Sequence, residues 1–182
     1  MSAPRSGAAA LADELRARGG TLAASLRPPG ADGGDSPGDD EPGPAQLGAA
    51  GPRARGHERD YELLLEMILE GSRLHYGEPR VLRCDDPDLA LLLGDQLYAM
   101  GLARLAELGD LEAVAELADL ISLVAQAQAD GHDELVAAVW GAGAAAIGWG
   151  SSPEHAAAKN LARAGQTEAV AALIRAAERA GK

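Results

Sequence analysis

Residues 61–76 read YELLLEMILEGSRLHY, and this stretch decides the fold class. Apolar or small side chains recur in it at i, i+3, i+4, i+7, i+8 and i+11; they are Tyr61, Leu64, Leu65, Ile68, Leu69 and Ser72. Side chains at this spacing share one face of an α-helix, whereas a half-buried strand alternates with a period of two. The stretch therefore predicts a helix with one buried face.

The sequence after this helix predicts several more. Asp86-Pro87 begins a second helix, because Asp favours the N-cap and Pro suits the first turn. We expect this helix to run over 88–108 and, since it is apolar on most sides, to be the central one. Further helices are predicted over 111–130, 133–149, 153–164 and 166–180. No segment alternates with a strand period, so the predicted fold class is all-α, a compact bundle of about four to six helices.

The first 56 residues have a different composition. Residues 8–18 predict a short helix that ends at Gly19. Residues 28–56 are rich in Gly and Pro, and such a stretch buries too little apolar surface to offset its ordering entropy. We therefore expect a short isolated helix or disorder over 1–27, a disordered linker over 28–56, and a helical domain over 57–182.

Charge and cysteine content narrow the function classes. The net charge is −12, and the acidic residues concentrate between residues 57 and 149. A domain this acidic repels phosphate backbones, so no nucleic-acid binding is expected. The single cysteine, Cys84, excludes an intramolecular disulfide framework and fits a reducing compartment. The N-terminus shows no signal-peptide pattern, so a cytoplasmic location is expected.

The longest uncharged run lies between Leu135 and Pro153 and is rich in Ala and Gly. A membrane-spanning helix needs ~20 strongly apolar residues. We therefore interpret this run as a buried helix and expect no membrane span.

Three segments carry a resemblance to a known family. They read GEPRV at 77–81, ALLLGDQLYA at 90–99 and ARLAELGD at 103–110. Together they resemble part of the trans-polyprenyl diphosphate synthases, in which a Gly-x-Pro loop leads to a helix carrying Ala-x-x-x-Gly-Asp. The resemblance implies that the bundle is a truncated isoprenoid-synthase-like fragment.

The same family binds magnesium and an allylic diphosphate through two Asp-rich motifs, which this chain lacks. The first motif belongs on the helix before the Gly-x-Pro loop, where this sequence has glutamates instead. We therefore expect no catalytic residues, no metal site and no cofactor.

The leading hypothesis is a non-catalytic helical protein acting by protein association, as a partner subunit like the small subunits of heteromeric synthases. The alternative is a self-associating helical adaptor unrelated to isoprenoids. A third hypothesis is an enzyme that uses Glu62, Glu66 and Glu70 with magnesium.

Polar and aromatic residues gather around the end of the first long helix and the loop after it. The candidate ligand-binding residues are Arg73, His75, Tyr76, Arg80 and Asp95. They would suit an anionic ligand; the alternative is that they satisfy the loop backbone and pack over the core. Asp95 lies between apolar residues, and we expect it to be buried beside a cation such as Arg73, Arg80 or Arg83.

Two groups of carboxylates have simpler interpretations than a metal site. Glu62, Glu66 and Glu70 follow one another at i, i+4 and i+8 opposite the apolar stripe, which predicts a solvated face. Asp85, Asp86 and Asp88 precede the second helix, where capping and the helix dipole account for them.

The second helix also predicts association. Leucines point around most of its circumference, and three neighbouring helices would cover it only by turning other apolar residues outward. Large exposed apolar patches are uncommon on monomers. We therefore expect a homodimer, or a heterodimer with a helical protein.

Overall fold

The computed structural model describes residues 7–28 and 42–180. Within these ranges the chain forms nine α-helices and one short 3-10 helix. The only extended pairing in the described ranges is an isolated antiparallel bridge between Leu26 and Leu82. The all-α prediction is therefore confirmed, with more helices than expected. Residues 29–41 of the predicted linker lie outside the described residues.

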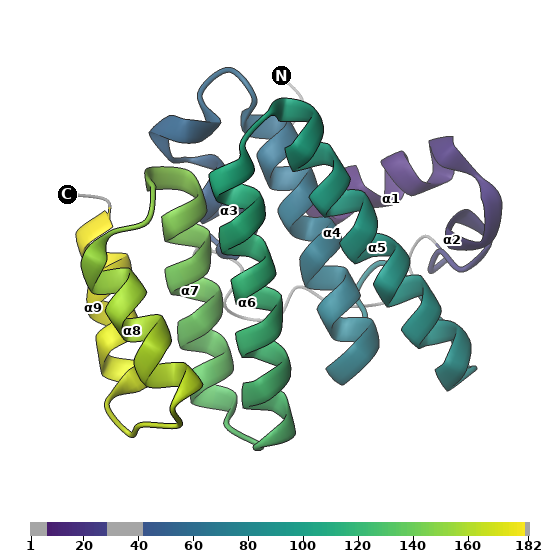
Figure 1. The fold of residues 1–182 in the computed structure, drawn as a ribbon. Coiled ribbons are helices and arrows are strands. Elements are labelled where there is room, and N and C mark those ends of the chain that lie inside the picture. Colours follow the sequence, from purple (N-terminus) through teal and green to yellow (C-terminus); the bar gives the residue numbers. More distant parts are fainter. Residues whose placement is uncertain (1–6, 29–41, 181–182) are drawn as a thin grey trace.

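The six helices predicted after residue 57 are all present. They are α4 (Glu58–Tyr76), α5 (Pro87–Leu108), α6 (Leu111–Ala129), α7 (Asp133–Trp149), α8 (Pro153–Arg163) and α9 (Ala169–Ala180). Figure 1 shows α4 to α7 running alternately down and up, with α8 and α9 on one flank. Short connections force this antiparallel order on neighbouring helices.

The predicted caps on either side of α5 are confirmed. The side chain of Asp86 accepts hydrogen bonds from the backbone N–H of Asp88 (3.0 Å) and of the next residue (3.3 Å). Gly109 ends α5 with a left-handed φ of 77°, which glycine adopts without strain. Asp110 then caps α6 by accepting from Ala113 N at 3.0 Å.

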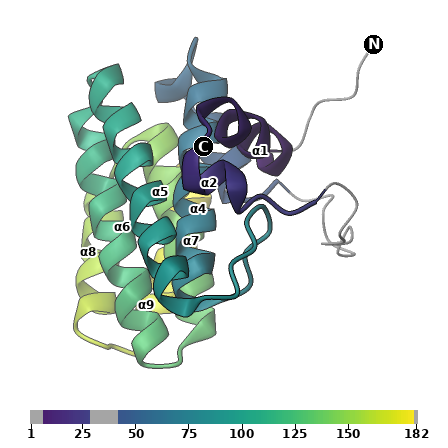
Figure 2. The ribbon, with the colours of Figure 1, turned by 90° about the vertical axis from the view of Figure 1, so that its right-hand side faces the viewer.

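The N-terminal helices are not isolated, so that prediction is wrong. Helices α1 (Gly7–Arg18) and α2 (Gly20–Ala24) lie on the opposite flank to α8 and α9, beside α4 (Figures 1 and 2). Leu11 and Leu15 are fully buried and Leu22 is 3% exposed. Because Leu11 and Leu15 are four residues apart, they form one apolar edge that docks on the bundle.

Part of the predicted linker also folds. Helix α3 (Pro44–Ala49) and the 3-10 helix η1 (Pro52–Ala54) pack against α4 and α7. The backbones touch at glycines: a Cβ atom on Gly148 of α7 would lie 2.5 Å from the carbonyl oxygen of Gly48. The high glycine content here serves close backbone approach, which composition does not distinguish from disorder.

The central helix is α7, and the expectation that the second helix would be central is wrong. Buried residues follow one another along α7 from Ala138 to Gly148, as predicted for this uncharged run. Helix α5 instead lies at the edge of the bundle and packs mainly on α4 (Figure 1). Only 28% of its most apolar 18-residue window is buried.

Candidate functional site

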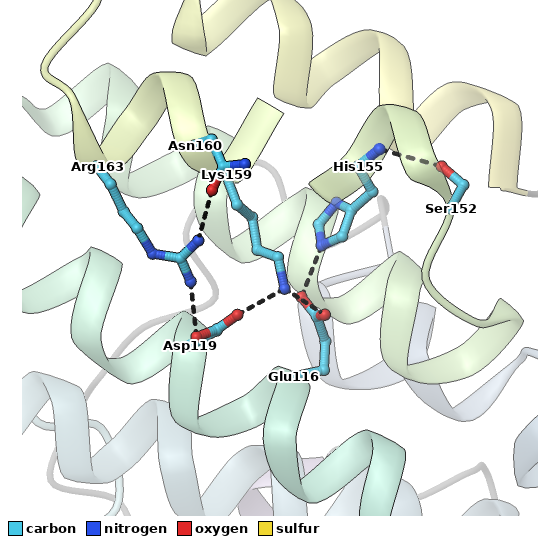
Figure 3. Close-up of polar contacts among 7 residues, drawn as sticks. All are labelled: Glu116, Asp119, Ser152, His155, Lys159, Asn160 and Arg163. Atoms are coloured by element: carbon cyan, nitrogen blue, oxygen red, sulfur yellow. Dashed lines mark hydrogen bonds and ion pairs between the residues drawn. The ribbon is translucent and has the colours of Figure 1, made fainter. Parts of the chain in front are cut away.

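A buried polar cluster joins α6 to α8 (Figure 3). Glu116 of α6 and His155 and Lys159 of α8 are all buried. Glu116 Oε1 lies 2.6 Å from His155 Nε2, and its Oε2 accepts from Lys159 Nζ at 2.7 Å. Lys159 also donates to Asp119 at 2.7 Å, and Arg163 lies 2.7 Å from the other oxygen of Asp119.

Helix periodicity builds this cluster. Glu116 and Asp119 are three residues apart on α6, and His155 and Lys159 are four apart on α8, so each pair shares a helix face. The N-cap Ser152 fixes the start of α8 by accepting from His155 N at 3.1 Å. The two faces then meet at hydrogen-bonding distance.

The electrostatics hold Glu116 and Lys159 in their charged forms. Burial alone would raise the pKa of Glu116, but hydrogen bonds from His155 and Lys159 outweigh burial and lower it. Burial would likewise lower the pKa of Lys159, but its hydrogen bonds to Asp119 and Glu116 raise it. The cluster is thus an ion-paired clamp between two helices.

A cavity of about 330 Å³ opens beside this clamp, between η1, α6, α7 and α8. The two cationic side chains that line this cavity, Arg53 and Lys159, are paired with carboxylates of the protein. Arg53 hydrogen-bonds to Asp110 and, at 2.7 Å, to Glu112, while Lys159 is held by Glu116. Since each of these cations is neutralised by the protein's own carboxylates, the lining presents no set of donors directed at a ligand.

The predicted ligand residues divide into two groups in the structure. His75 stacks on Tyr98, with ring centroids 5.2 Å apart, and its Nε2 lies 3.1 Å from Asp95 Oδ1. The Asp95 side chain is 70% exposed, so the predicted buried carboxylate with an arginine partner is wrong. Tyr76, at the end of α4, is 43% exposed. Asp95 points outward because α5 lies at the edge of the bundle.

Arg73 and Arg80 belong to a different cluster, around the buried Glu70. This carboxylate accepts hydrogen bonds from the backbone N–H of Arg80 (3.0 Å), Val81 (2.7 Å) and Leu82 (2.8 Å), and Arg73 lies 3.7 Å away. Glu70 therefore organises the loop between α4 and α5. The loop backbone is thus satisfied by Glu70, which was not among the candidate residues, and Arg73 lies beside that carboxylate.

The predicted solvated glutamate face is also wrong. Glu70 is fully buried and Glu66 is 4% exposed, because α4 has neighbours on both sides. Burial raises the pKa of Glu66, while Arg80 and Arg73 partly offset that effect. Glu66 packs against the first residue of α1: a Cβ atom on Gly7 would lie 2.5 Å from Glu66 Oε1.

The residues described contain no group of three or more His, Cys, Asp or Glu placed to hold a metal ion.

Within the same ranges, α5 is long and apolar enough to cross a membrane by length and composition alone. Its exposed apolar side chains include Leu91 (45%) and Leu92 (65%), and Leu111 just beyond it is 71% exposed.

Sequence reasoning missed the clamp between α6 and α8. His155 lies in the first turn of α8, and no motif in the sequence singles it out. The signal was available in the i, i+3 and i, i+4 spacings of Glu116, Asp119, His155 and Lys159, which place opposite charges on helix faces that also carry apolar core residues.

Comparisons with protein-family models, with curated proteins and with solved structures found no match to this chain.

Proposed function

We propose that the chain acts by protein association, without a catalytic step, and that it associates through the outer face of α5. The apolar residues of this outer face are Leu92, Ala99, Ala103 and Ala106, with Leu91 beside it, and all are exposed. The exposed polar residues Asp95 and Gln96 lie on the same face, between Leu92 and Ala99. The observation that carries the proposal is the exposure of Leu91 and Leu92 on the most exposed of the long apolar helices, α5. A helix this apolar is ordinarily buried on most sides, so a missing neighbour explains its composition.

The spacing of the outer face suits another helix. Leu92, Ala99, Ala103 and Ala106 recur at i, i+7, i+11 and i+14, which places them in one row along α5. Small residues at Ala99 and Ala103 let a second helix approach closely. At 1.5 Å per residue α5 is roughly 33 Å long, enough for an interface of standard size, on the order of 1,600 Å² in total.

The occupant that we propose is α5 of a second copy. Two copies related by a two-fold axis place the same apolar row on itself. Exposed acids lie within the row as well as at its ends: Asp86 and Asp88 are at one end, Asp95 lies between Leu92 and Ala99, and Glu107 is at the other end. They repel one another in such a dimer, so salt should strengthen the contact by screening this repulsion.

The same acids favour one alternative occupant. A helical protein whose apolar face is flanked by basic residues would pair with them, and salt would weaken that complex. The resemblance of residues 77–110 to polyprenyl diphosphate synthases supports a synthase as this partner, with the present chain as the non-catalytic subunit. The alternative function is an adaptor unrelated to isoprenoids, and for that function self-association through α5 would be sufficient.

The test compares two substitutions of exposed apolar residues. Leu92→Asp places a charge in the outer face of α5, whereas Ile174→Asp places one on α9, where Ile174 is 47% exposed. Both should leave stability within about 0.5 kcal/mol, as is usual for surface sites. Light scattering after gel filtration should find that Leu92→Asp is monomeric while Ile174→Asp remains dimeric.

Equal masses for the two variants would refute the α5 interface. A separate assay addresses catalysis: turnover of an allylic diphosphate by purified protein with magnesium would overturn the non-catalytic proposal.

A further inference from the structure

The structure contains a second apolar surface, which the chain covers with its own N-terminus. Buried side chains of α4, α5 and the loop between them form a cluster separate from the main core. We call it the α4/α5 groove, and its residues are Met67, Leu74, Val81, Leu82, Leu93 and Leu97. The groove is distinct from the outer face of α5, because Leu93 and Leu97 are buried whereas Leu92 is exposed.

Its occupant is the segment of residues 7–27, comprising α1, α2 and the bridge residues. Leu11, Leu15 and Leu22 complete the apolar cluster from one side. Without this segment, the six groove side chains would lose the leucines that cover them. The occupied groove thus has the form of a helix-in-groove recognition site.

Polar contacts fix the register of the segment in the groove. Arg27 N donates to Val81 O at 3.0 Å and Arg83 N donates to Ser25 O at 2.8 Å, which forms a short antiparallel pairing. The Arg27 guanidinium donates to the carbonyl oxygens of Pro79 (2.9 Å) and Leu82 (3.2 Å). The loop therefore binds the end of the segment largely through backbone atoms.

A further ion pair joins the segment to α5. Glu14 of α1 lies 3.4 Å from Arg104, which also hydrogen-bonds to Asp60 of α4 at 2.9 Å. This contact, the three leucines and the backbone pairing all come from residues 7–27. One contiguous segment thus makes all of these contacts.

We propose that the α4/α5 groove also accepts residues 7–27 of a second copy of this chain, so that two copies exchange their N-terminal segments. The second copy offers the same leucines, the same Arg27 and the same backbone groups, so an exchanged dimer keeps each of these contacts. Exchange of an identical segment between two copies is a low-cost route to a dimer. Residues 28–43 join the segment to α3, and 29–41 of them lie outside the described residues.

The covalent connection between the segment and its groove sets the concentration at which exchange occurs. A segment in the same chain as its binding site competes with an effective concentration on the order of 1 mM. The closed arrangement, in which residues 7–27 fill the groove of their own chain, should therefore dominate at micromolar protein, and exchange should appear as the protein approaches about 1 mM. This dependence separates exchange from association through the outer face of α5.

Two experiments on full-length protein test the exchange. In the first, Leu92→Asp protein, which lacks the α5 contact, is unfolded and refolded at about 1 mM and at about one hundredth of that concentration. We expect a dimer only at the higher concentration. The matched control is the Leu92→Asp protein with two further substitutions, Leu11→Asp and Leu15→Asp, which replace the buried leucines of α1. This triple variant should stay monomeric at both concentrations.

The second experiment covers the case in which the triple variant fails to fold. A fluorescent peptide of residues 7–28 is added to wild-type protein and to the Leu11→Asp/Leu15→Asp protein, with the doubly substituted peptide as control. The substituted protein should bind the wild-type peptide about ten-fold or more tightly than wild type does, because its own segment no longer competes. The substituted peptide should bind neither protein.

Two results would overturn the exchange. One is a Leu92→Asp protein that remains monomeric at the higher concentration. The other is a Leu11→Asp/Leu15→Asp protein that keeps a cooperative helical melt yet does not bind the wild-type peptide. Neither result depends on whether the outer face of α5 mediates association, so the two proposals fail separately.

Discussion

Removal of the Glu116 carboxylate should destabilise the chain more than removal of any exposed acid on the same helix. Glu116→Ala leaves Lys159 with Asp119 alone and leaves the buried His155 ring without its partner. Breaking a buried ion pair from one side costs about 3–5 kcal/mol, because the remaining charge stays buried. Lys159 keeps one carboxylate here, so we expect a cost near the lower end, about 3 kcal/mol.

The assay is thermal unfolding followed by helical circular dichroism. For a chain of this length, 1 kcal/mol shifts the midpoint by about 2–4 °C, so Glu116→Ala should lower it by about 6–12 °C. The matched control is Glu112→Ala, one turn earlier on α6, whose side chain is 83% exposed and pairs with Arg53. An exposed pair of this kind contributes only about 0–1 kcal/mol. If the two variants melt within a degree of each other, α8 is not clamped to α6 in the way described.

Three further predictions concern stability. Glu70→Ala should cost about 3 kcal/mol or more, because three backbone N–H groups of the loop lose their acceptor at about 1–3 kcal/mol each; urea unfolding measures this, and a change below about 1 kcal/mol would contradict it. Truncation of residues 1–28 should lower the melting midpoint by several degrees, since Leu11, Leu15 and Leu22 no longer cover the groove; an unchanged midpoint would show that the segment does not dock. Wild-type protein should lose stability as pH falls below about 4.5, because Glu116 has a lower pKa in the folded state than its usual 4.5 and its contribution is present only above the unfolded value; Glu116→Ala should flatten this acid limb, and an identical slope would contradict the assignment.

The sequence predicted the helices well because their limits depend on local chemistry. Asp86, Gly109 and Asp110 act at the ends of α5 and α6 through hydrogen bonds or backbone angles within a few residues. The apolar stripe from Tyr61 to Leu69 is buried as its period indicated. Such signals require no knowledge of the tertiary arrangement.

The order of packing was not predictable in the same way. The apolar composition of α5 indicated a central helix, yet α7, with its small residues, occupies the centre. Composition shows that a face needs cover, but it does not show which chain provides it. Because α5 lies at the edge of the bundle and not at its centre, Leu92 and Asp95 are both exposed.

The buried carboxylates illustrate a second limit. Glu70 lies opposite the apolar stripe of α4, and the period alone predicted solvent there. Three backbone N–H groups of the following loop fold back over it and make burial tolerable. The docking of Leu11 on the far side of α4 likewise depends on contacts across a long stretch of chain, which local patterns do not encode.

The central claim is that this chain associates through the outer face of α5, and sedimentation of the full-length wild-type protein tests it most directly. At micromolar concentration we predict a species of twice the chain mass of 18.6 kDa. Its dimer fraction should rise with added salt, because Asp86, Asp88 and Glu107 repel their counterparts less when screened. A single species of 18.6 kDa at both low and high salt would contradict self-association through this face.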